Sequence, residues 1–117
     1  MVQYGFYYDN SRCTGCKTCV MACKDYKDSA LDVAYRKVYD LEGGTWEKQA
    51  DDIYTTDCLF YHLSMACNHC DDPACVSVCP TTAMHKEGKR GLVLVDETKC
   101  VGCGYCVMAC PYNAPKV

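Results

Sequence analysis

Polar and apolar residues alternate over several short stretches of this chain, which predicts short β-strands. The first stretch is Gln3–Tyr8, which is rich in aromatic residues. The next two, Tyr35–Asp40 and Thr45–Lys48, flank Gly43-Gly44, a pair typical of a hairpin turn. A fourth stretch, Cys58–Met65, predicts another strand.

The second half of the chain continues the same pattern. Ala83–Lys86 and Gly91–Val95 predict a hairpin closed by Glu87–Arg90. The charged run Lys86–Arg90, K-E-G-K-R, is interpreted as a solvated turn, with a docking patch as the alternative. Short helices are predicted at Thr18–Ala22, Ala74–Val78 and Tyr105–Ala109. The expected fold is therefore α+β and ferredoxin-like, with short helices, small antiparallel sheets or hairpins and long loops.

The composition predicts a thin apolar core. Of the 117 residues 13 are cysteine, while Leu, Ile, Phe and Trp are scarce, so that bound metal clusters would have to serve as the core. The net charge of −3 leaves no basic footprint for nucleic acid. No run approaches the roughly 20 apolar residues of a membrane span, and Met1–Arg12 lacks the pattern of a secretory signal. We therefore expect no membrane span and no export signal in this chain.

Twelve cysteines form three closely spaced groups. Motif one reads C-x2-C-x2-C-x3-C, motif two C-x2-C-x4-C-x3-C-P and motif three C-x2-C-x2-C-x3-C-P, the last being the ligand run of bacterial ferredoxins. Their cysteines are Cys13, Cys16, Cys19 and Cys23; Cys67, Cys70, Cys75 and Cys79; and Cys100, Cys103, Cys106 and Cys110. The chemistry that this spacing indicates is one-electron transfer through iron–sulfur clusters.

Two other uses of cysteine fit the pattern less well. Disulfides in secreted domains usually use an even number of cysteines, and zinc sites usually use two C-x2-C pairs with a longer spacer. This chain has an odd number of cysteines and crowded groups of four. Iron–sulfur clusters are therefore preferred over both alternatives.

Motifs two and three can exchange ligands. In two-cluster ferredoxins the fourth cysteine of one motif binds the cluster of the other motif. One cluster would then use Cys67, Cys70, Cys75 and Cys110, and the other would use Cys100, Cys103, Cys106 and Cys79. The exchange predicts one two-cluster domain over residues 58–117, leaving residues 1–57 as motif one with an insert, half of a split domain.

Motif one has no partner motif in this sequence, and Lys24 follows its last cysteine where motifs two and three have proline. Cys13, Cys16 and Cys19 would hold a third cluster and Cys23 would serve a fourth. The alternatives are a self-contained cluster closed by Cys23, or a chain that lacks a further C-terminal motif. We favour the second.

At these residues the chain resembles a known family, the four-cluster ferredoxin subunits of molybdopterin oxidoreductases. Within that family it is most similar to the electron-transfer subunit of anaerobic dimethyl sulfoxide reductase. The stretches that carry the resemblance are Gln3–Cys19, Cys23–Asp28, Gly43–Trp46, Cys67–Cys75, Ala83–Lys86 and Cys100–Tyr112.

The resemblance implies [4Fe–4S] clusters, four in a full-length member, and a fourth cysteine group, so we expect this chain to be C-terminally truncated. It implies an electron-transfer subunit that is not itself catalytic. Electrons would pass from a quinol-oxidising membrane anchor to a molybdopterin catalytic subunit that reduces dimethyl sulfoxide or N-oxides in anaerobic respiration. The chain would be held at the membrane by these partners, on the periplasmic side of a bacterial inner membrane.

Three residues outside the ligand scheme, Cys58, His69 and His85, are candidates for lesser roles. Cys58 is expected to be a small buried hydrophobe. His69, inside motif two, either donates a hydrogen bond to a cluster sulfur or is a plain loop residue. His85 is expected at a surface or in packing, with a subunit interface or a proton-coupled site as the alternative. His62 is assigned no role.

The main competing function is a free-standing ferredoxin that shuttles electrons between soluble partners. The long insert Asp25–Ala66 argues against it, because a minimal two-cluster ferredoxin needs little beyond its motifs. A zinc-binding interaction module is the remaining alternative.

Overall fold

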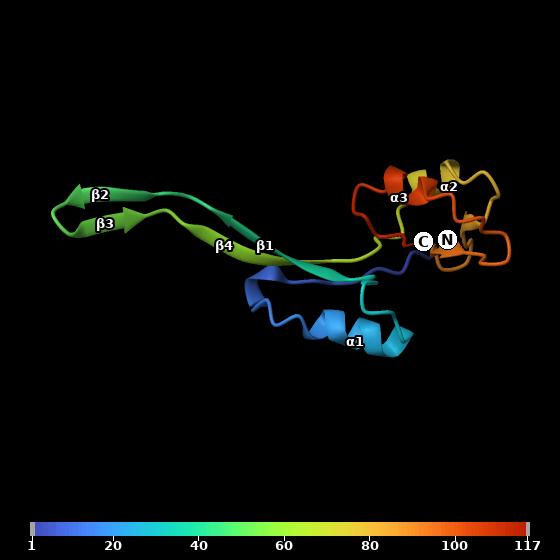
Figure 1. The fold of residues 1–117 in the computed structure, drawn as a ribbon, viewed down its shortest axis with the longest axis horizontal. Helices are drawn as coiled ribbons and strands as arrows, with labels where there is room; N and C mark the ends of the chain where they lie inside the picture. The colour runs from blue at the N-terminus through green and yellow to red at the C-terminus, as the bar shows by residue number, and fades with distance from the viewer. Residues whose placement is uncertain (1, 117) are drawn as a thin grey trace.

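The computed structural model describes residues 2–116, which form short helices and three separate two-stranded antiparallel sheets (Figure 1). This confirms the predicted fold class. The helices are η1 (Asn10–Arg12), α1 (Thr18–Lys27), α2 (Ala74–Ser77) and α3 (Tyr105–Ala109). The strands are β1 (Lys37–Gly43), β2 (Trp46–Ala50), β3 (Ile53–Thr56), β4 (Leu59–Met65), β5 (Met84–Lys86) and β6 (Val93–Val95).

The expected thin core is what the structure contains. Among the described residues, only Ala83 and Val93 are buried apolar side chains. The chain measures 66 × 31 × 28 Å with a radius of gyration of 19.1 Å, whereas a compact domain of this length has roughly 13 Å. The molecule is therefore elongated, and its three parts can be described in turn.

The first part, residues 66–116, carries motifs two and three and is called the two-motif unit. Helices α2 and α3 lie together on one side of it, and the β5–β6 hairpin lies on the other (Figure 1). The hairpin pairs Met84 with Val95 and Lys86 with Val93, as its sequence predicted. Both helices also fall where they were predicted, although α2 ends one residue earlier.

The second part, residues 9–36, is called the motif-one segment. Its helix α1 was predicted over Thr18–Ala22 but runs to Lys27. The physical reason is that residue 24 is a lysine, which a helix accepts. The equivalent residues 80 and 111 are prolines, which lack a backbone N–H and stop the helix. The Lys24 ammonium also donates to the carbonyl oxygens of Ala30, Leu31 and Val33 at 3.0, 2.9 and 2.6 Å, which fixes the loop after the helix.

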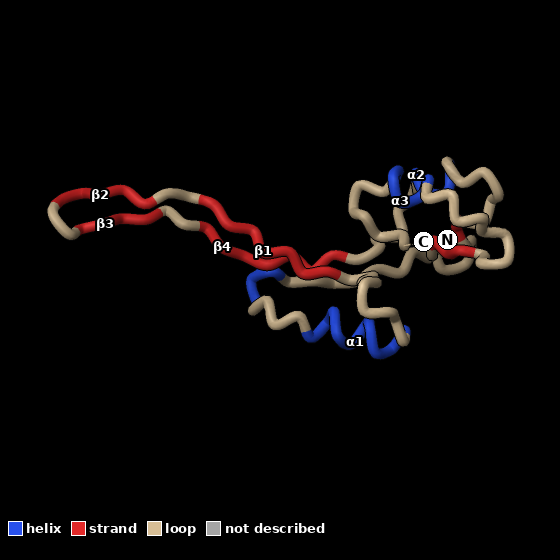
Figure 2. Tube along the Cα trace, in the orientation of Figure 1, coloured by secondary structure: helices blue, strands red, loops and turns tan. Residues whose placement is uncertain are grey.

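The third part, residues 37–65, is called the β arm. Strand β1 pairs with β4, and β2 pairs with β3 further out, so that two short ribbons follow one another and project from the rest of the chain (Figure 2). The predicted strand Cys58–Met65 is confirmed as β4. The turn at the tip is formed by Asp51 and Asp52, the latter with φ 63°.

The predicted hairpin at Gly43-Gly44 is wrong. Strand β1 ends at these glycines, β2 follows in nearly the same direction, and both find their partners after the Asp51-Asp52 turn. Gly44 has φ +94°, and a Cβ there would lie 2.7 Å from the carbonyl oxygen of Asp57. The glycine is therefore required by the close passage of two backbones and not by a turn.

The predicted strand Gln3–Tyr8 is also wrong, because this segment joins no sheet. Its hydrogen bonds instead connect the parts of the molecule. The Tyr4 N–H donates to the Arg90 carbonyl at 3.2 Å in the two-motif unit, and the Tyr8 hydroxyl donates to the His62 carbonyl at 2.7 Å in the β arm. Among the described residues, this segment therefore links the two-motif unit to the β arm and forms no strand ladder.

Candidate metal centre

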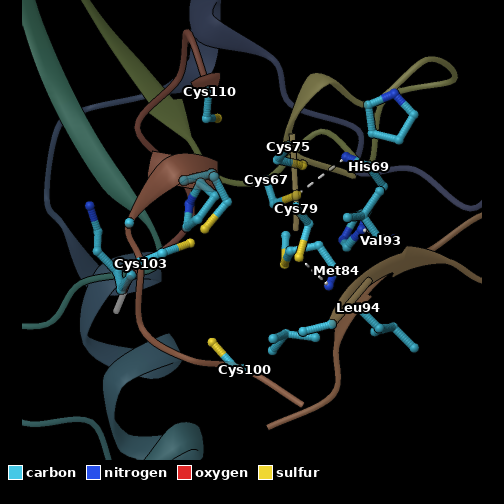
Figure 3. A pocket seen from close by; sticks show the side chains of 18 of the residues that line it. Cys67, His69, Cys75, Cys79, Met84, Val93, Leu94, Cys100, Cys103 and Cys110 are labelled. Carbon is cyan, nitrogen blue, oxygen red and sulfur yellow. Dashed lines mark hydrogen bonds between the residues drawn. The ribbon is translucent and has the colours of Figure 1, made fainter. Parts of the chain in front are cut away.

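One cavity of about 490 Å³ lies inside the two-motif unit (Figure 3). All eight cysteines of motifs two and three line it: Cys67, Cys70, Cys75, Cys79, Cys100, Cys103, Cys106 and Cys110. Apolar residues such as Ala83 and Val93 complete the wall. Residues up to 43 positions apart in the sequence are thus gathered around one space, as the predicted ligand exchange requires.

In each motif, the loop between the first two cysteines contains one residue with left-handed backbone. Gly15 and Gly102 both have φ +69°, and His69 occupies the equivalent position in motif two with φ 46°. Glycine adopts this conformation without strain, whereas histidine adopts it at a cost. A strained residue at such a position suggests that its side chain or its N–H has a function.

His69 has contacts that account for its strained backbone. Its backbone N–H donates to the Cys67 Sγ at 3.4 Å (Figure 3), and its ring Nδ1 accepts from the Val93 N–H at 2.9 Å. The predicted sulfur hydrogen bond therefore comes from the backbone of His69, while its ring anchors the loop to strand β6. The Gln3 side chain adds a bond to the His69 carbonyl at 3.1 Å.

The two Cys-Pro sequences produce the same turn. Thr82 and Asn113, each three residues after the last cysteine of a motif, have φ 54° and 52°. After Cys79 the chain turns back so that the Met84 N–H donates to the Cys79 Sγ at 3.4 Å. This bond is the main cause that lowers the pKa of the Cys79 thiol below its usual value, because it stabilises the thiolate.

The electrostatics of the thiols indicate which cysteines are neighbours. Burial raises the pKa of Cys75, and the charges of Cys67 and Cys110 raise it further. Burial likewise raises the pKa of Cys67, and the charges of Cys110 and Cys70 raise it further. Such effects act only over short distances, so Cys110 lies close to Cys67 and Cys75.

The first three cysteines of motif three form a comparable set. Burial raises the pKa of Cys106, and the charges of Cys103 and Cys100 raise it further. Thiols with raised pKa values resist ionisation in the metal-free protein. Because iron binds the thiolate, cluster insertion has to displace these protons.

Sequence reasoning missed the turns that precede two of the motifs. In Asp9-x-Ser11 the side chain of Asp9 accepts from the Ser11 N–H at 3.0 Å and the Ser11 hydroxyl at 2.6 Å. In Asp96-x-Thr98 the Asp96 carboxylate makes the same two bonds at the same distances. The shared pattern D-x-[ST]-[KR]-C before Cys13 and Cys100 could have revealed these turns.

Sequence reasoning also missed the role of Lys86, because the charged run that contains it was interpreted as a solvated turn. Its side chain is only 17% exposed, and its ammonium donates to the Cys70 carbonyl at 2.8 Å and to the Asp71 carbonyl at 3.3 Å. Motif two has two more residues between its second and third cysteines than motif three. Lys86 therefore holds this longer loop against the hairpin.

Motif one lies outside the cavity. None of its four cysteines lines it; Cys16 and Cys19 are exposed, while Cys13 and Cys23 are half-buried. The Thr18 side chain lowers the pKa of the exposed Cys16 thiol by hydrogen bonding, at 3.3 Å. Among the residues that the structure describes, motif one therefore has the local ligand geometry without the second set of thiols.

Motif one is supported by the β arm through His62, to which the sequence assigned no role. A Cβ on Gly15 would lie 2.5 Å from the His62 ring, so the ring packs directly on the loop between Cys13 and Cys16. The Asp40 carboxylate holds this ring at 2.7 Å from Nδ1. His62 is thus a packing residue for the motif-one loop.

Two sequence expectations concern residues away from the cavity. Cys58 was expected to be buried but is exposed, because it lies at the irregular joint between the two ribbons of the β arm. His85 lies on the exposed side of strand β5, where its Nδ1 donates to the Ala83 carbonyl at 3.1 Å. The surface position predicted for His85 is therefore confirmed.

The donor set of the cavity fits two iron–sulfur clusters. It offers eight thiols, backbone N–H donors aimed at the Cys67 and Cys79 sulfurs, and apolar walls. Sulfur ligands with N–H···S bonds are the environment that such clusters use. Across residues 2–116 no three Cys, His, Asp or Glu side chains converge on one position for a single metal ion; the thiols stand around the cavity instead.

These features define an iron–sulfur protein of ferredoxin type, and comparison with known families agrees. Residues 58–117 match the 4Fe–4S dicluster domain, and residues 4–25 match a 4Fe–4S binding domain. The chain belongs to the 4Fe–4S dicluster domain family. Its cofactors are [4Fe–4S] clusters, as the family resemblance implied.

Curated relatives narrow the class further. The sequence is 56% identical to the B subunit of anaerobic dimethyl sulfoxide reductase from Haemophilus influenzae, over 99% of this chain and 56% of that protein. It is 54% identical to the corresponding B subunit from Escherichia coli, over 97% of this chain and 55% of that protein. The formate dehydrogenase iron-sulfur subunit of Wolinella succinogenes is 39% identical, over 95% of this chain and 50% of that protein.

The resemblance to the iron–sulfur subunit of dimethyl sulfoxide reductase is therefore confirmed. The chain spans about half the length of the curated relatives it matches. In the described part, residues 2–116, no helix has the length and apolar character needed to cross a bilayer.

Proposed function

We propose that this chain is the electron-transfer part of a respiratory enzyme complex. It would relay electrons from a quinol-oxidising membrane anchor to a molybdopterin catalytic subunit that reduces dimethyl sulfoxide or N-oxides. The observation that carries the proposal is the 56% identity to a dimethyl sulfoxide reductase B subunit over 99% of the chain. The similarity includes the β arm, which holds none of the cluster ligands and which a stand-alone ferredoxin would not need.

The ligand scheme is part of the proposal. Cys67, Cys70, Cys75 and Cys110 would bind one cluster, and Cys100, Cys103, Cys106 and Cys79 a second. The charge effects of Cys110 on Cys67 and Cys75 support the first set. In motif one, Cys13, Cys16 and Cys19 would bind a third cluster and Cys23 a fourth, and the local geometry that motif one shares with motif three supports this.

The clusters, when bound, supply reversible one-electron chemistry. The chain's own residues set the conditions for it. The His69 and Met84 N–H groups donate to the Cys67 and Cys79 sulfurs and favour the more negative, reduced state. Lys86 and the His69 ring fix the loops that carry these groups.

The remaining parts of the proposal follow from this role. Substrate reduction would take place in the catalytic subunit and not in this chain. The domain boundary is proposed between residues 57 and 58, and the family match over 58–117 supports it. Strands β1 and β4 lie on opposite sides of this boundary and pair with each other. The partners would hold the chain at the periplasmic face of the bacterial inner membrane.

The first experiment measures iron and acid-labile sulfide per chain after anaerobic purification, together with EPR of the reduced sample. About eight irons, four for each [4Fe–4S] cluster, with spectral coupling between two clusters, are expected from the two-motif unit. About twelve irons would show that motif one closes its own cluster through Cys23. A protein without iron would overturn the ligand scheme.

A second experiment distinguishes the complex from a free-standing shuttle. The protein is purified under mild conditions from cells that also make the molybdopterin and anchor subunits. Stoichiometric co-purification, with cluster signals oxidised by dimethyl sulfoxide, is expected. Recovery of all the protein as a free monomer whose clusters do not respond would favour the shuttle.

A further inference from the structure

The β arm lacks a supporting layer. It projects from the motif-one segment as two successive two-stranded ribbons, and no other described element covers its outer half (Figures 1 and 2). Isolated two-stranded ribbons are marginally stable in water. The exposure of an arm of this length is therefore a structural cost that a partner surface would offset.

The strand register gives the inner ribbon two different faces. His62 and Ser64 of β4 lie on one face and contact motif one, His62 through Gly15 and Ser64 through Cys19 at 3.4 Å. Side chains alternate along a strand, so the neighbouring positions lie on the opposite face. That face, here called the apolar arm face, consists of Tyr39, Leu41, Leu59, Tyr61 and Leu63.

The apolar arm face is open. Leu59 is 61% exposed, and Tyr39, Leu41 and Tyr61 are between 36 and 41% exposed. Further out, Trp46 and Tyr54 lie on one face of the β2–β3 ribbon and are also exposed. A contiguous set of large apolar and aromatic side chains on a projecting element marks an interaction site.

The charge of the arm identifies the kind of surface that would cover it. Residues 37–65 contain six carboxylates and two lysines, a net charge of −4 with His62 neutral, against −3 for the whole chain. Four of the carboxylates, Glu47, Asp51, Asp52 and Asp57, lie in or near the outer ribbon. An acidic arm is repelled by anionic lipid headgroups and by the arm of a second copy, and is attracted to a basic protein surface.

We propose that the β arm docks on the catalytic subunit, in an apolar cleft bordered by lysine and arginine side chains. This inference rests on the proposed function, since it assigns the arm to one subunit of the same complex. The apolar arm face would provide the buried contact and the carboxylates of the arm would provide orientation and salt dependence. His62, on the other face, would couple the docked arm to the motif-one loop.

The test uses two matched double substitutions in the full complex. Leu41→Ser with Tyr61→Ser removes a cross-strand pair from the apolar arm face. Glu42→Ser with Phe60→Ser, the next pair in the same ladder, changes the opposite face. Affinity for the purified catalytic subunit is measured at several salt concentrations, with iron content and EPR of each sample as the folding control.

Binding of the first variant is expected to be roughly tenfold weaker or more, with iron content unchanged, while the second variant stays within about threefold of the parent. Equal binding by both variants and the parent would overturn the docking role while leaving the proposed function intact. A parent chain that does not bind the catalytic subunit at all would instead refute the proposed function.

A third variant covers the case in which the first loses its clusters. Asp51→Lys with Asp52→Lys changes the exposed tip only, where the Asp51 side chain is fully exposed. It is expected to weaken binding at low salt and to flatten the salt dependence. Stronger binding, or arm-dependent binding of the parent to protein-free vesicles of phosphatidylethanolamine and phosphatidylglycerol, would overturn the proposal.

Discussion

Motifs one and three have nearly the same local backbone but different surroundings. Both begin with an aspartate-capped turn, both place a glycine at φ +69° between their first two cysteines, and both continue into a helix. Only motif three shares a cavity with a second motif. Local sequence is therefore enough to shape a ligand loop, while the shared cavity depends on a second motif that arrives from elsewhere in the fold.

The two regions differ again after the last cysteine. In motifs two and three the Cys-Pro sequence ends the helix, and a left-handed residue turns the chain back towards the cavity. In motif one Lys24 allows α1 to continue to Lys27 and ties down the following loop. The following predictions would break or sharpen this comparison, from the largest expected effect to the smallest.

The largest effect is expected from ligand substitutions in the two-motif unit. If Cys110 binds the cluster of motif two, Cys110→Ser removes about four irons per chain, one [4Fe–4S] cluster. Adding Cys67→Ser should then remove no more, because both changes affect one cluster. Adding Cys100→Ser should remove about eight in total.

Iron analysis and EPR of the same samples provide the measurement. Cys58→Ser is the control and should leave the iron content unchanged, since Cys58 lies in the β arm and not in the cavity. The opposite pattern would mean that each motif binds its own cluster. In that pattern, adding Cys67→Ser to Cys110→Ser removes further iron, and adding Cys100→Ser removes none.

The next effect tests the helix that distinguishes motif one. Lys24→Pro introduces the proline of the other motifs inside α1 and should cost about 3 kcal/mol of local stability. Amide hydrogen exchange should speed up from residue 24 to residue 33 and stay unchanged in the two-motif unit. Lys24→Met is the control, because it keeps the helix and removes only the bonds to the loop carbonyls. Unchanged exchange in the proline variant would contradict the role given to Lys24.

A smaller effect is expected at His69, which stands where motifs one and three have glycine. His69→Gly relieves the backbone but loses the ring bond to the Val93 N–H, so the N–H bond to Cys67 weakens. A hydrogen bond worth about 1 kcal/mol corresponds to roughly 40 mV for one electron, and the potential of one cluster should become more negative.

A redox titration followed by EPR would measure the shift at His69. His85→Gly is the matched control, since the His85 ring bonds only to the Ala83 carbonyl among the described residues. A shift of the same size in both variants would mean that the ring of His69 has no special connection to Cys67.

The smallest effect concerns the turn before motif three. Hydrogen bonds from Thr98, and then from Lys99, lower the pKa of Asp96 below its usual value. A carboxyl whose pKa is lower in the folded state stabilises the fold above its unfolded pKa of about 3.9, and this contribution is lost as the pH falls through the folded value. Asp96→Asn should therefore speed cluster loss in denaturant slightly at neutral pH, and the difference should disappear in acid.

Asp9→Asn tests the same turn in motif one and should leave cluster loss from the two-motif unit unchanged. The visible absorption of the clusters during denaturation provides the measurement. A difference for Asp96→Asn that grows on acidification would contradict the sign derived from its pKa.

Much of the two-motif unit could be predicted because its determinants are local. The spacing of four cysteines, proline after the last one and a short apolar run before it determined the positions of α2 and α3. The β5–β6 hairpin followed from alternation over a few residues. Within these segments each residue's preferred conformation agrees with the fold.

The errors fell where pairing is non-local. Gly43-Gly44 has the sequence of a turn, but the pairing of β1 with β4 across a long sequence separation converts it into a close backbone passage. Gln3–Tyr8 has the alternation of a strand, but no strand lies beside it among the described residues. Alternation of polar and apolar residues indicates that the two faces of a segment have different surroundings, but it does not indicate which element lies beside the segment.

The amino-acid sequence by itself determined the chemistry of this protein, because cysteine spacing limits both the ligand type and the loop that presents it. Only the tertiary structure decided which thiols share a cavity, that the His69 backbone bonds to a sulfur, and that His62 packs on motif one. The physical reason is that short-range conformational preferences act along the chain, whereas these contacts form between segments that meet only after folding.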